Sequence, residues 1–170
     1  GLVPQRERMT ADTIFDAASL TKVIATAPAI MKLLEDGKID VESPLSRHLP
    51  EFKGHGKEAI TVRQLLTHSS GLRAGLPRRK WSGKKGALEA ACAEPLPNPP
   101  GTVYRYSDIN FILLGLLVER VAGVPLEEFC RREIFEPLGM KDTAFRDLSG
   151  RGERQQIADQ RTHRAADDPH

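Results

Sequence analysis

The sequence is poor in several features that point to particular classes of protein. Only two of its 170 residues are cysteine, so the disulfide framework of a small secreted protein is not indicated. It has no uninterrupted apolar stretch of about 18 residues, and a membrane-spanning helix is therefore not expected. Its formal net charge is only +2, which is too weak to indicate a nucleic-acid partner.

The residues that bind metals are equally sparse. Free thiols are favoured over a disulfide between Cys92 and Cys130, because both fall in helix-like segments. The five histidines are scattered without the spacing of a metal-ligand set, so no metal or other cofactor is expected.

The segment 1–10 lacks an apolar signal core. The sequence therefore leaves the compartment unknown, and the cytoplasm is the default expectation.

Most of the chain has the pattern of helix, with few alternating segments that would indicate strands. Hydrophobic residues make up 39% and charged residues 28%, which fits a single globular domain with its own core. Helices are expected at 19–36 (ended by Gly37), 44–48, 62–68 (capped by Thr61), 87–93 and 107–122, with a further helix opening at Pro125.

Three segments follow from this pattern. Residues 1–13 are polar and are expected to be irregular, 14–145 form the helical domain, and 146–170 are polar with little fixed structure. The helix at 107–122 is apolar around most of its circumference, so it should be central and buried. Pro28 should kink the first long helix or remove its bond to Ile24.

Ser19 and Lys22 are the first candidates for catalysis. They are three residues apart, so they share one face of the expected helix. Lys22 is the only charged residue between Ala17 and Met31, and burial among apolar neighbours would lower its pKa and favour the neutral amine. A neutral amine beside a serine hydroxyl can accept its proton, which turns the serine into a nucleophile.

The chain carries a second copy of the Ser-x-x-Lys pattern at Ser82 and Lys85. This copy lies in a basic, glycine-containing stretch next to Trp81. No buried helix is expected there to desolvate the lysine, so we interpret it as a solvent-exposed loop.

A second candidate group precedes the central helix. Ser107 or Asp108 can cap that helix, and Tyr106 lies at its mouth, where a phenol can extend into a cleft. A nearby lysine would favour the phenolate. The alternative interpretation is structural, with a capping residue and a tyrosine packed on the core.

Taken together, these motifs resemble those of the class C β-lactamase-related serine hydrolases, which include those β-lactamases, the D-amino-acid peptidases and carboxypeptidases, and the family VIII esterases. The matching blocks, in the family's order, are Ala18 to Lys22, Val62 to Leu72, Pro100-Gly101 with Tyr104, Tyr106 to Asp108, Leu113 to Gly115, and Phe135 to Met140 with Thr143. The resemblance covers about 14–145. It implies the helical portion of the β-lactamase/transpeptidase-like α/β fold, with most of the sheet missing, so the chain itself should be mainly α.

The resemblance also implies a serine hydrolase that works through an acyl-enzyme on small carboxylic esters, with β-lactams as a second substrate class. Ser19 would be the nucleophile, and Lys22 and Tyr106 would share the role of general base. The backbone N–H of Ser19 would supply half of the oxyanion hole. His68 falls in a block that looks structural in the family, so it is a poor candidate for catalysis.

Two departures from the family pattern matter. Asp108 stands in the substrate-binding position where the family has asparagine. A carboxylate cannot donate a hydrogen bond to a substrate carbonyl, which favours an esterase, and Asp108 can instead pair with Lys22 and oppose a lowered lysine pKa. A competing register reads Ser107-Asp108 as the start of Ser-Asp-Asn, but Ile109 stands in the asparagine position.

The second departure is that the family's Lys-Thr-Gly or His-x-Gly-like third motif is not found. The alternative function is therefore a truncated, non-catalytic helical module with a binding or self-association role. Such a module would form homo-oligomers through exposed apolar helix faces.

Overall fold

In the computed structural model, which describes residues 8–11, 13–77 and 81–146, every extended regular element is a helix. No strand is present among those residues, and the one β-type pairing recorded there is an antiparallel bridge between Pro44 and Thr61. The expectation of a mainly helical chain is confirmed.

The chain divides into two units. The larger is Ser19–Ala144, and the smaller combines the segments Gly1–Ala18 and Phe145–His170. In the smaller unit, the backbone N–H of Thr10 donates to the hydroxyl of Thr13. All elements discussed below belong to the larger unit.

The helices of the larger unit follow the expected order, with shifts at their ends. In chain order they are the 3-10 turn η1 (Ala18–Leu20), which begins one residue before this unit and carries Ser19, the π-helix η2 (Lys22–Thr26), α1 (Ala27–Glu35), the short 3-10 turns η3 (Leu45–Arg47) and η4 (Lys57–Ala59), α2 (Val62–Leu66), α3 (Gly83–Ala93), α4 (Asp108–Ala122), α5 (Leu126–Cys130) and the π-helix η5 (Arg131–Phe135).

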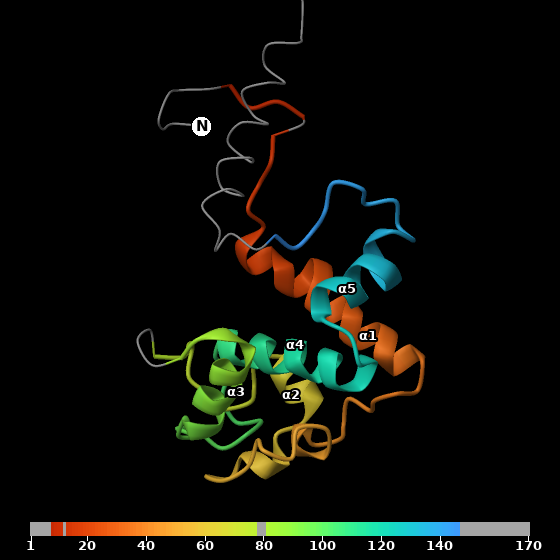
Figure 1. Ribbon diagram of the computed structural model, residues 1–170. Coiled ribbons are helices and arrows are strands. Elements are labelled where there is room, and N and C mark those ends of the chain that lie inside the picture. The colour runs from red at the N-terminus through yellow and green to blue at the C-terminus, as the bar shows by residue number, and fades with distance from the viewer. Residues whose placement is uncertain (1–7, 12, 78–80, 147–170) are drawn as a thin grey trace, which may run out of the picture. The chain divides into compact units, whose positions relative to one another are not determined.

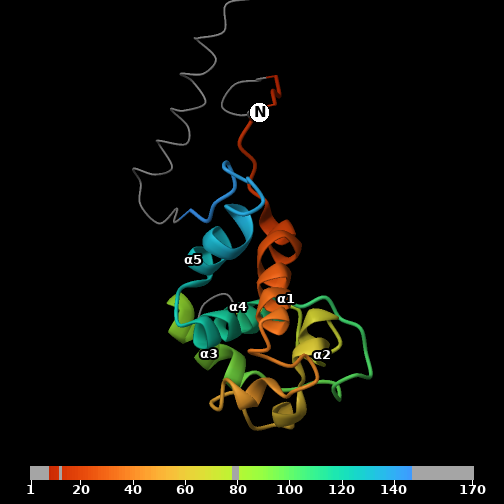
Figure 2. The same cartoon turned by 90° about the vertical axis from the view of Figure 1, so that its right-hand side faces the viewer.

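Helix α4 is the centre of this unit, as its apolar circumference predicted. It packs against α1, α2, α3, α5 and η2. The views in Figures 1 and 2 show it between the pair α1 and α5 and the pair α2 and α3. Its buried face contributes Ile109, Leu113, Leu114, Leu117 and Val118 to a single hydrophobic core.

The first long helix contains a wide turn just before Pro28. The backbone N–H of Ala27 donates to the carbonyl of Lys22, five residues back, and this closes the π-helix. Proline has no N–H to donate to the carbonyl of residue 24. A single π turn is one local adjustment found where the hydrogen bonds of an α-helix are interrupted. The helix therefore continues into α1 instead of breaking.

Caps fix the ends of two helices in the predicted manner. Gly37 has a left-handed φ of 67° and donates its N–H to Leu34 at 3.0 Å, which ends α1. Thr61 and Gln64 form a reciprocal capping box at the start of α2. Ser107 occupies the N-cap position of α4, but its side chain makes no capping bond.

The interpretation of the second Ser-x-x-Lys copy as a loop was wrong. Helix α3 begins at Gly83, so Lys84 lies in its first turn instead of a loop. Lys84 forms an ion pair with Glu119 of α4 at 2.6 Å, and this tertiary contact offsets the weak helix propensity of Gly83. The lysines remain mostly exposed, as expected.

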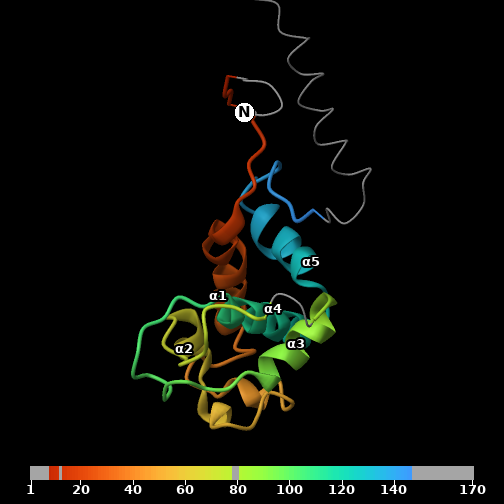
Figure 3. The ribbon, with the colours of Figure 1, turned by 90° about the vertical axis from the view of Figure 1, so that its left-hand side faces the viewer.

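Lys57 is a buried cation that the sequence did not reveal. Its side chain is 0% exposed and donates to the carbonyls of Cys92 and Glu94, the latter at 2.7 Å. A weaker contact of 3.4 Å reaches Ala91. These carbonyls lie at the C-terminal end of α3, where a helix has no backbone donors of its own. Lys57 therefore joins the 54–60 turn to the end of α3. Figure 3 shows the ribbon of α3 from this side.

Two further expectations concern thiols and membrane spans. Cys92 and Cys130 are both free, as favoured. Within 8–11, 13–77 and 81–146, no single helix is long and apolar enough to cross a membrane; Asp108–Ala122 and Leu126–Phe135 meet the criteria only as a pair bent by 77°.

Candidate active site

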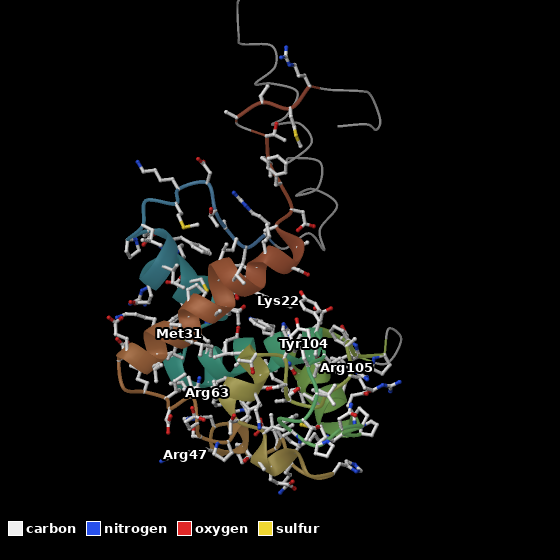
Figure 4. All side chains as sticks on the ribbon, turned by 180° about the vertical axis from the view of Figure 1, so that it is seen from behind. Lys22, Met31, Arg47, Arg63, Tyr104 and Arg105 are labelled. Atoms are coloured by element: carbon white, nitrogen blue, oxygen red, sulfur yellow. The ribbon has the colours of Figure 1, made fainter. Side chains whose placement is uncertain are left out.

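Lys22 reaches from the π-helix to the start of α4. Its Nζ lies 2.7 Å from Oδ1 of Asp108, and its side chain is only 14% exposed. Figure 4 shows Lys22 beside the segment that carries Tyr104 and Arg105, directly before α4. The structure thus brings together two candidates that are 86 residues apart in the sequence.

Tyr106 completes this group. The Nζ of Lys22 lies 4.9 Å from the centre of its ring. The polar groups of Lys22 and of Ser19 lie close enough to the phenol to lower the pKa of Tyr106, with Lys22 the larger cause. The lowered pKa favours the phenolate, which is the form that can accept a proton.

Ser19 and Tyr106 are both accessible. Ser19 is exposed, and 44% of Tyr106 is exposed. A substrate can therefore reach the hydroxyl that would attack it. All four residues proposed from the sequence, including Asp108, lie together in this site.

The expectation of a neutral Lys22 was wrong. Burial by itself lowers the pKa of Lys22, but the hydrogen bond to Asp108 and the proximity of Tyr106, together with the charges of these residues, outweigh it, so the pKa is raised. Val23, one of the apolar neighbours thought to desolvate the amine, is 62% exposed. Asp108, the first residue of α4, keeps Lys22 charged, as the sequence analysis expected for the case in which the two residues pair.

The loop after α2 holds Tyr106 in place through the backbone on either side of it. Arg105 donates its N–H to the carbonyl of His68 at 2.8 Å, and Asp108 donates its N–H to Ala74 at 2.7 Å. Between them, the Ser107 hydroxyl donates to the carbonyl of Arg73 at 2.6 Å. This bond explains why Ser107 is not available as a side-chain cap for α4.

His68 packs directly on the site, against Tyr106 and Phe111. Its Nδ1 accepts the backbone N–H of Ser107 at 3.1 Å, so a neutral ring carries its proton on Nε2. Its ring centre lies 4.6 Å from that of Tyr106 and 5.2 Å from that of Phe111. Burial, and then the charge of Lys22, lowers the pKa of His68. These contacts support the prediction that His68 has a structural role.

Two supporting features were missed in the sequence. Ser70 donates to the side-chain oxygen of Asn110 at 2.7 Å, and both residues are buried. Gly71 has a φ of +83°, and a Cβ built on it would lie 2.1 Å from the carbonyl oxygen of Asn98. The Ser-Ser-Gly sequence after His68 was the signal available for both features. It marks a tight turn that only glycine can complete.

The arrangement combines three groups whose chemistry is complementary. An accessible hydroxyl, a phenol with a lowered pKa and an ammonium paired with a carboxylate suit acyl transfer. In the part of the chain that the structure describes, no group of three His, Cys, Asp or Glu residues could hold a metal ion.

Comparison with known proteins agrees with this chemistry. The family model for beta-lactamase matches residues 3–170, which extends the resemblance beyond 14–145 at both ends. A relative from Salmonella schwarzengrund, named "Putative D-alanyl-D-alanine carboxypeptidase", is 35% identical over 155 residues; the alignment covers 83% of this chain and 36% of the relative.

Solved structures give the same result. The structure of D-amino acid amidase from Ochrobactrum anthropi SV3, complexed with L-phenylalanine, is 29% identical with a TM-score of 0.65, and the match covers 78% of this chain and 40% of that one. A D-stereospecific amidohydrolase from Streptomyces sp. is 31% identical with a TM-score of 0.63, and the match covers 72% of this chain and 42% of that one.

The chain belongs to the beta-lactamase family of hydrolases. Its helices correspond to part of the β-lactamase/transpeptidase fold. The chain spans 36% of the length of the Salmonella relative and about two fifths of the two amidohydrolase structures.

Proposed function

We propose that this chain is a serine hydrolase that cleaves small carboxylic esters through an acyl-enzyme at Ser19. One observation carries the proposal: Tyr106 lies beside both Lys22, whose Nζ is 4.9 Å from the ring centre, and Ser19, and these two neighbours lower the pKa of the phenol. A hydroxyl in contact with a phenolate has a proton acceptor within reach, which an ordinary surface serine lacks.

The reaction begins when the Ser19 oxygen attacks the ester carbonyl and its proton passes to the Tyr106 phenolate. The Lys22 ammonium offsets the negative charge of the phenolate before transfer. The backbone N–H of Ser19 supplies one donor to the oxyanion. As the tetrahedral intermediate collapses, Tyr106 returns the proton to the departing alcohol. Water then attacks the acyl-enzyme by the same route and releases the acid.

Asp108 is proposed to bind substrate with the oxygen that Lys22 leaves free. Its side chain is 59% exposed, so a substrate can reach it. An ionised carboxylate accepts hydrogen bonds and donates none. It therefore suits a substrate that offers an N–H or O–H at this point, and it disfavours a substrate carbonyl.

The relatives suggest which further substrates to test. Their names are "Putative D-alanyl-D-alanine carboxypeptidase" and D-amino acid amidase, so we include D-amino-acid amides in the assays. We propose β-lactams as the second substrate class because the matching family model is the one for beta-lactamase.

The test is hydrolysis of p-nitrophenyl butyrate by the purified chain and by Ser19→Ala. We expect the variant to fall to the rate of the uncatalysed reaction. Ser82→Ala is the matched control, because it removes the serine of the other Ser-x-x-Lys copy and should retain full activity. Intact mass after reaction should show one acyl group on the wild type and none on Ser19→Ala. Equal hydrolysis by the wild type and Ser19→Ala would refute the proposal.

The second candidate function is a non-catalytic module that self-associates through an apolar face. One helical run exposes several large apolar side chains at helical spacing. They are Leu20, Val23, Met31 and Leu34, which are 63%, 62%, 45% and 37% exposed. Such a stripe is unusual on the surface of a monomer. A concentration-dependent dimer that gives no acyl adduct would favour this candidate, and a monomer that forms the adduct would exclude it.

A further inference from the structure

Lys22 has a carboxylate partner in a position where the family pattern has an amide. We infer that Asp108 is a positioning residue that keeps Lys22 as an ammonium, so that Tyr106 alone exchanges the proton of Ser19. The inference deepens the proposed function, because it assigns separate roles to two residues that the family pattern treats as a shared base.

The geometry that supports this division is a direct contact. Lys22 Nζ and Asp108 Oδ1 are 2.7 Å apart, and Lys22 is 14% exposed. A charge-assisted hydrogen bond of this length favours the charged forms of both partners. An asparagine in the same place would contribute a dipole but no charge, so it could not hold the proton on Lys22 as firmly.

Among the described residues, the other groups around Lys22 are not carboxylates or have ion-pair partners of their own. Tyr106 faces it from the segment before α4, and His68 faces it from the loop after α2. Helix α5 also packs against the π-helix. Its acidic residues Glu127 and Glu128 pair with Lys84 and Arg131.

The charged groups of α1, which continues directly from the π-helix η2, also have partners. Lys32 pairs with Glu35 and Asp36 at 3.0 and 2.9 Å. Asp108 is thus the one carboxylate in the described chain that forms an ion pair with Lys22.

The consequence is a division of labour. An ammonium has no lone pair and cannot accept the Ser19 proton, so the proton goes to the phenolate. The ammonium remains in place throughout the cycle and stabilises the phenolate each time it re-forms. The carboxylate keeps the cation beside the ring, 4.9 Å from its centre, instead of letting it swing to solvent.

The experiment titrates Lys22 directly in the full chain. Lysine is labelled with ¹³C at the ε carbon, and the Lys22 signal is assigned by its absence in Lys22→Arg. The chemical shift is then followed from about pH 6 to pH 11 in the wild type, Asp108→Asn and Asp108→Glu. Glu89→Gln is the charge-matched control, because it removes one exposed carboxylate whose ion pair is with Lys85.

We expect Lys22 of the wild type to remain an ammonium beyond the ordinary lysine midpoint of about pH 10.4. The midpoint should move to lower pH in Asp108→Asn, return towards the wild type in Asp108→Glu, and stay unchanged in Glu89→Gln. A wild-type midpoint below about pH 8 would overturn the inference. An unchanged midpoint in Asp108→Asn would do the same.

The titration needs no turnover, so it is independent of the ester assay. A chain that holds Lys22 charged but shows no Ser19-dependent hydrolysis would refute the proposed function and leave the inference intact. A neutral Lys22 in a chain that forms the acyl-enzyme would do the reverse.

Discussion

Replacing Lys57 by methionine tests whether a buried cation stabilises the larger unit. The substitution keeps a long unbranched chain of similar volume and removes only the ammonium. The carbonyls of Cys92 and Glu94 lose their donor, as does the more distant carbonyl of Ala91. The contact of the ammonium with the Phe52 ring, 5.6 Å from its centre, is lost as well.

The magnitude depends on two opposing terms. Hydrogen bonds from a charged donor contribute about 1.5–3 kcal/mol each, so the two short ones together contribute roughly 3–6 kcal/mol. Against this, the ammonium is fully buried, and its desolvation cost, which also lowers the pKa of Lys57, disappears in the variant. Because buried carbonyls at a helix end remain without donors, we expect a net loss of about 2–3 kcal/mol.

Thermal and urea unfolding followed by circular dichroism measure this loss. A decrease in Tm of roughly 4–12 °C corresponds to it for a chain of this size. Lys53→Met is the matched control, because Lys53 is an exposed lysine four residues away and its replacement should change stability by less than about 0.5 kcal/mol. A Lys57→Met variant as stable as the wild type would refute the reasoning, since desolvation would then equal or exceed the hydrogen bonds.

Three further outcomes are expected. Gly71→Ala should lower Tm by more than Lys53→Met does, because the new Cβ would lie 2.1 Å from the Asn98 carbonyl oxygen and the φ of this position is strained for alanine. A Tm equal to that of the wild type would contradict this. Tyr106→Phe should reduce kcat/KM about 100- to 10,000-fold. In the wild type, kcat/KM should fall as pH drops through the lowered pKa of Tyr106. If Tyr106→Phe shows the same decrease at low pH, the titrating group is a residue other than Tyr106. The double variant Leu20→Gln with Val23→Gln should reduce any self-association seen by light scattering, because both side chains are over 60% exposed.

Local patterns predicted the helices well where neighbouring residues decide the structure. The central position of α4 follows from its apolar circumference, and the ends of α1 and α2 follow from Gly37 and Thr61. The start of α3 was placed four residues too late, at Ala87. Its first turn depends on Lys84 reaching Glu119, 35 residues further along the chain, and no local pattern contains that contact.

The grouping of the four candidate residues was predictable from the sequence, but the charge of Lys22 was not. Ser19 and Lys22 are neighbours in the sequence, and the motif around Tyr106 marks the second half of the site. The charge of Lys22 depends on which atoms of α4 lie beside its Nζ, and apolar neighbours in sequence do not determine this. Val23 and Ile24 adjoin Lys22 in the chain, yet Asp108 is the partner that raises its pKa.

The loop after α2 links the stability of the fold to the geometry of the site. The same short segment contains His68, which accepts the N–H of Ser107, and Gly71, whose turn lies against the 95–102 segment. It also contains Ser70, whose hydroxyl is bonded to Asn110 inside α4. Because Tyr106 is fixed through backbone bonds to this loop on both sides, we expect a change that loosens the loop to displace the phenol from Ser19 before it unfolds the core. In the proposed mechanism, this loop would then affect the rate of ester hydrolysis through the position of the Tyr106 hydroxyl, without itself supplying a reacting group.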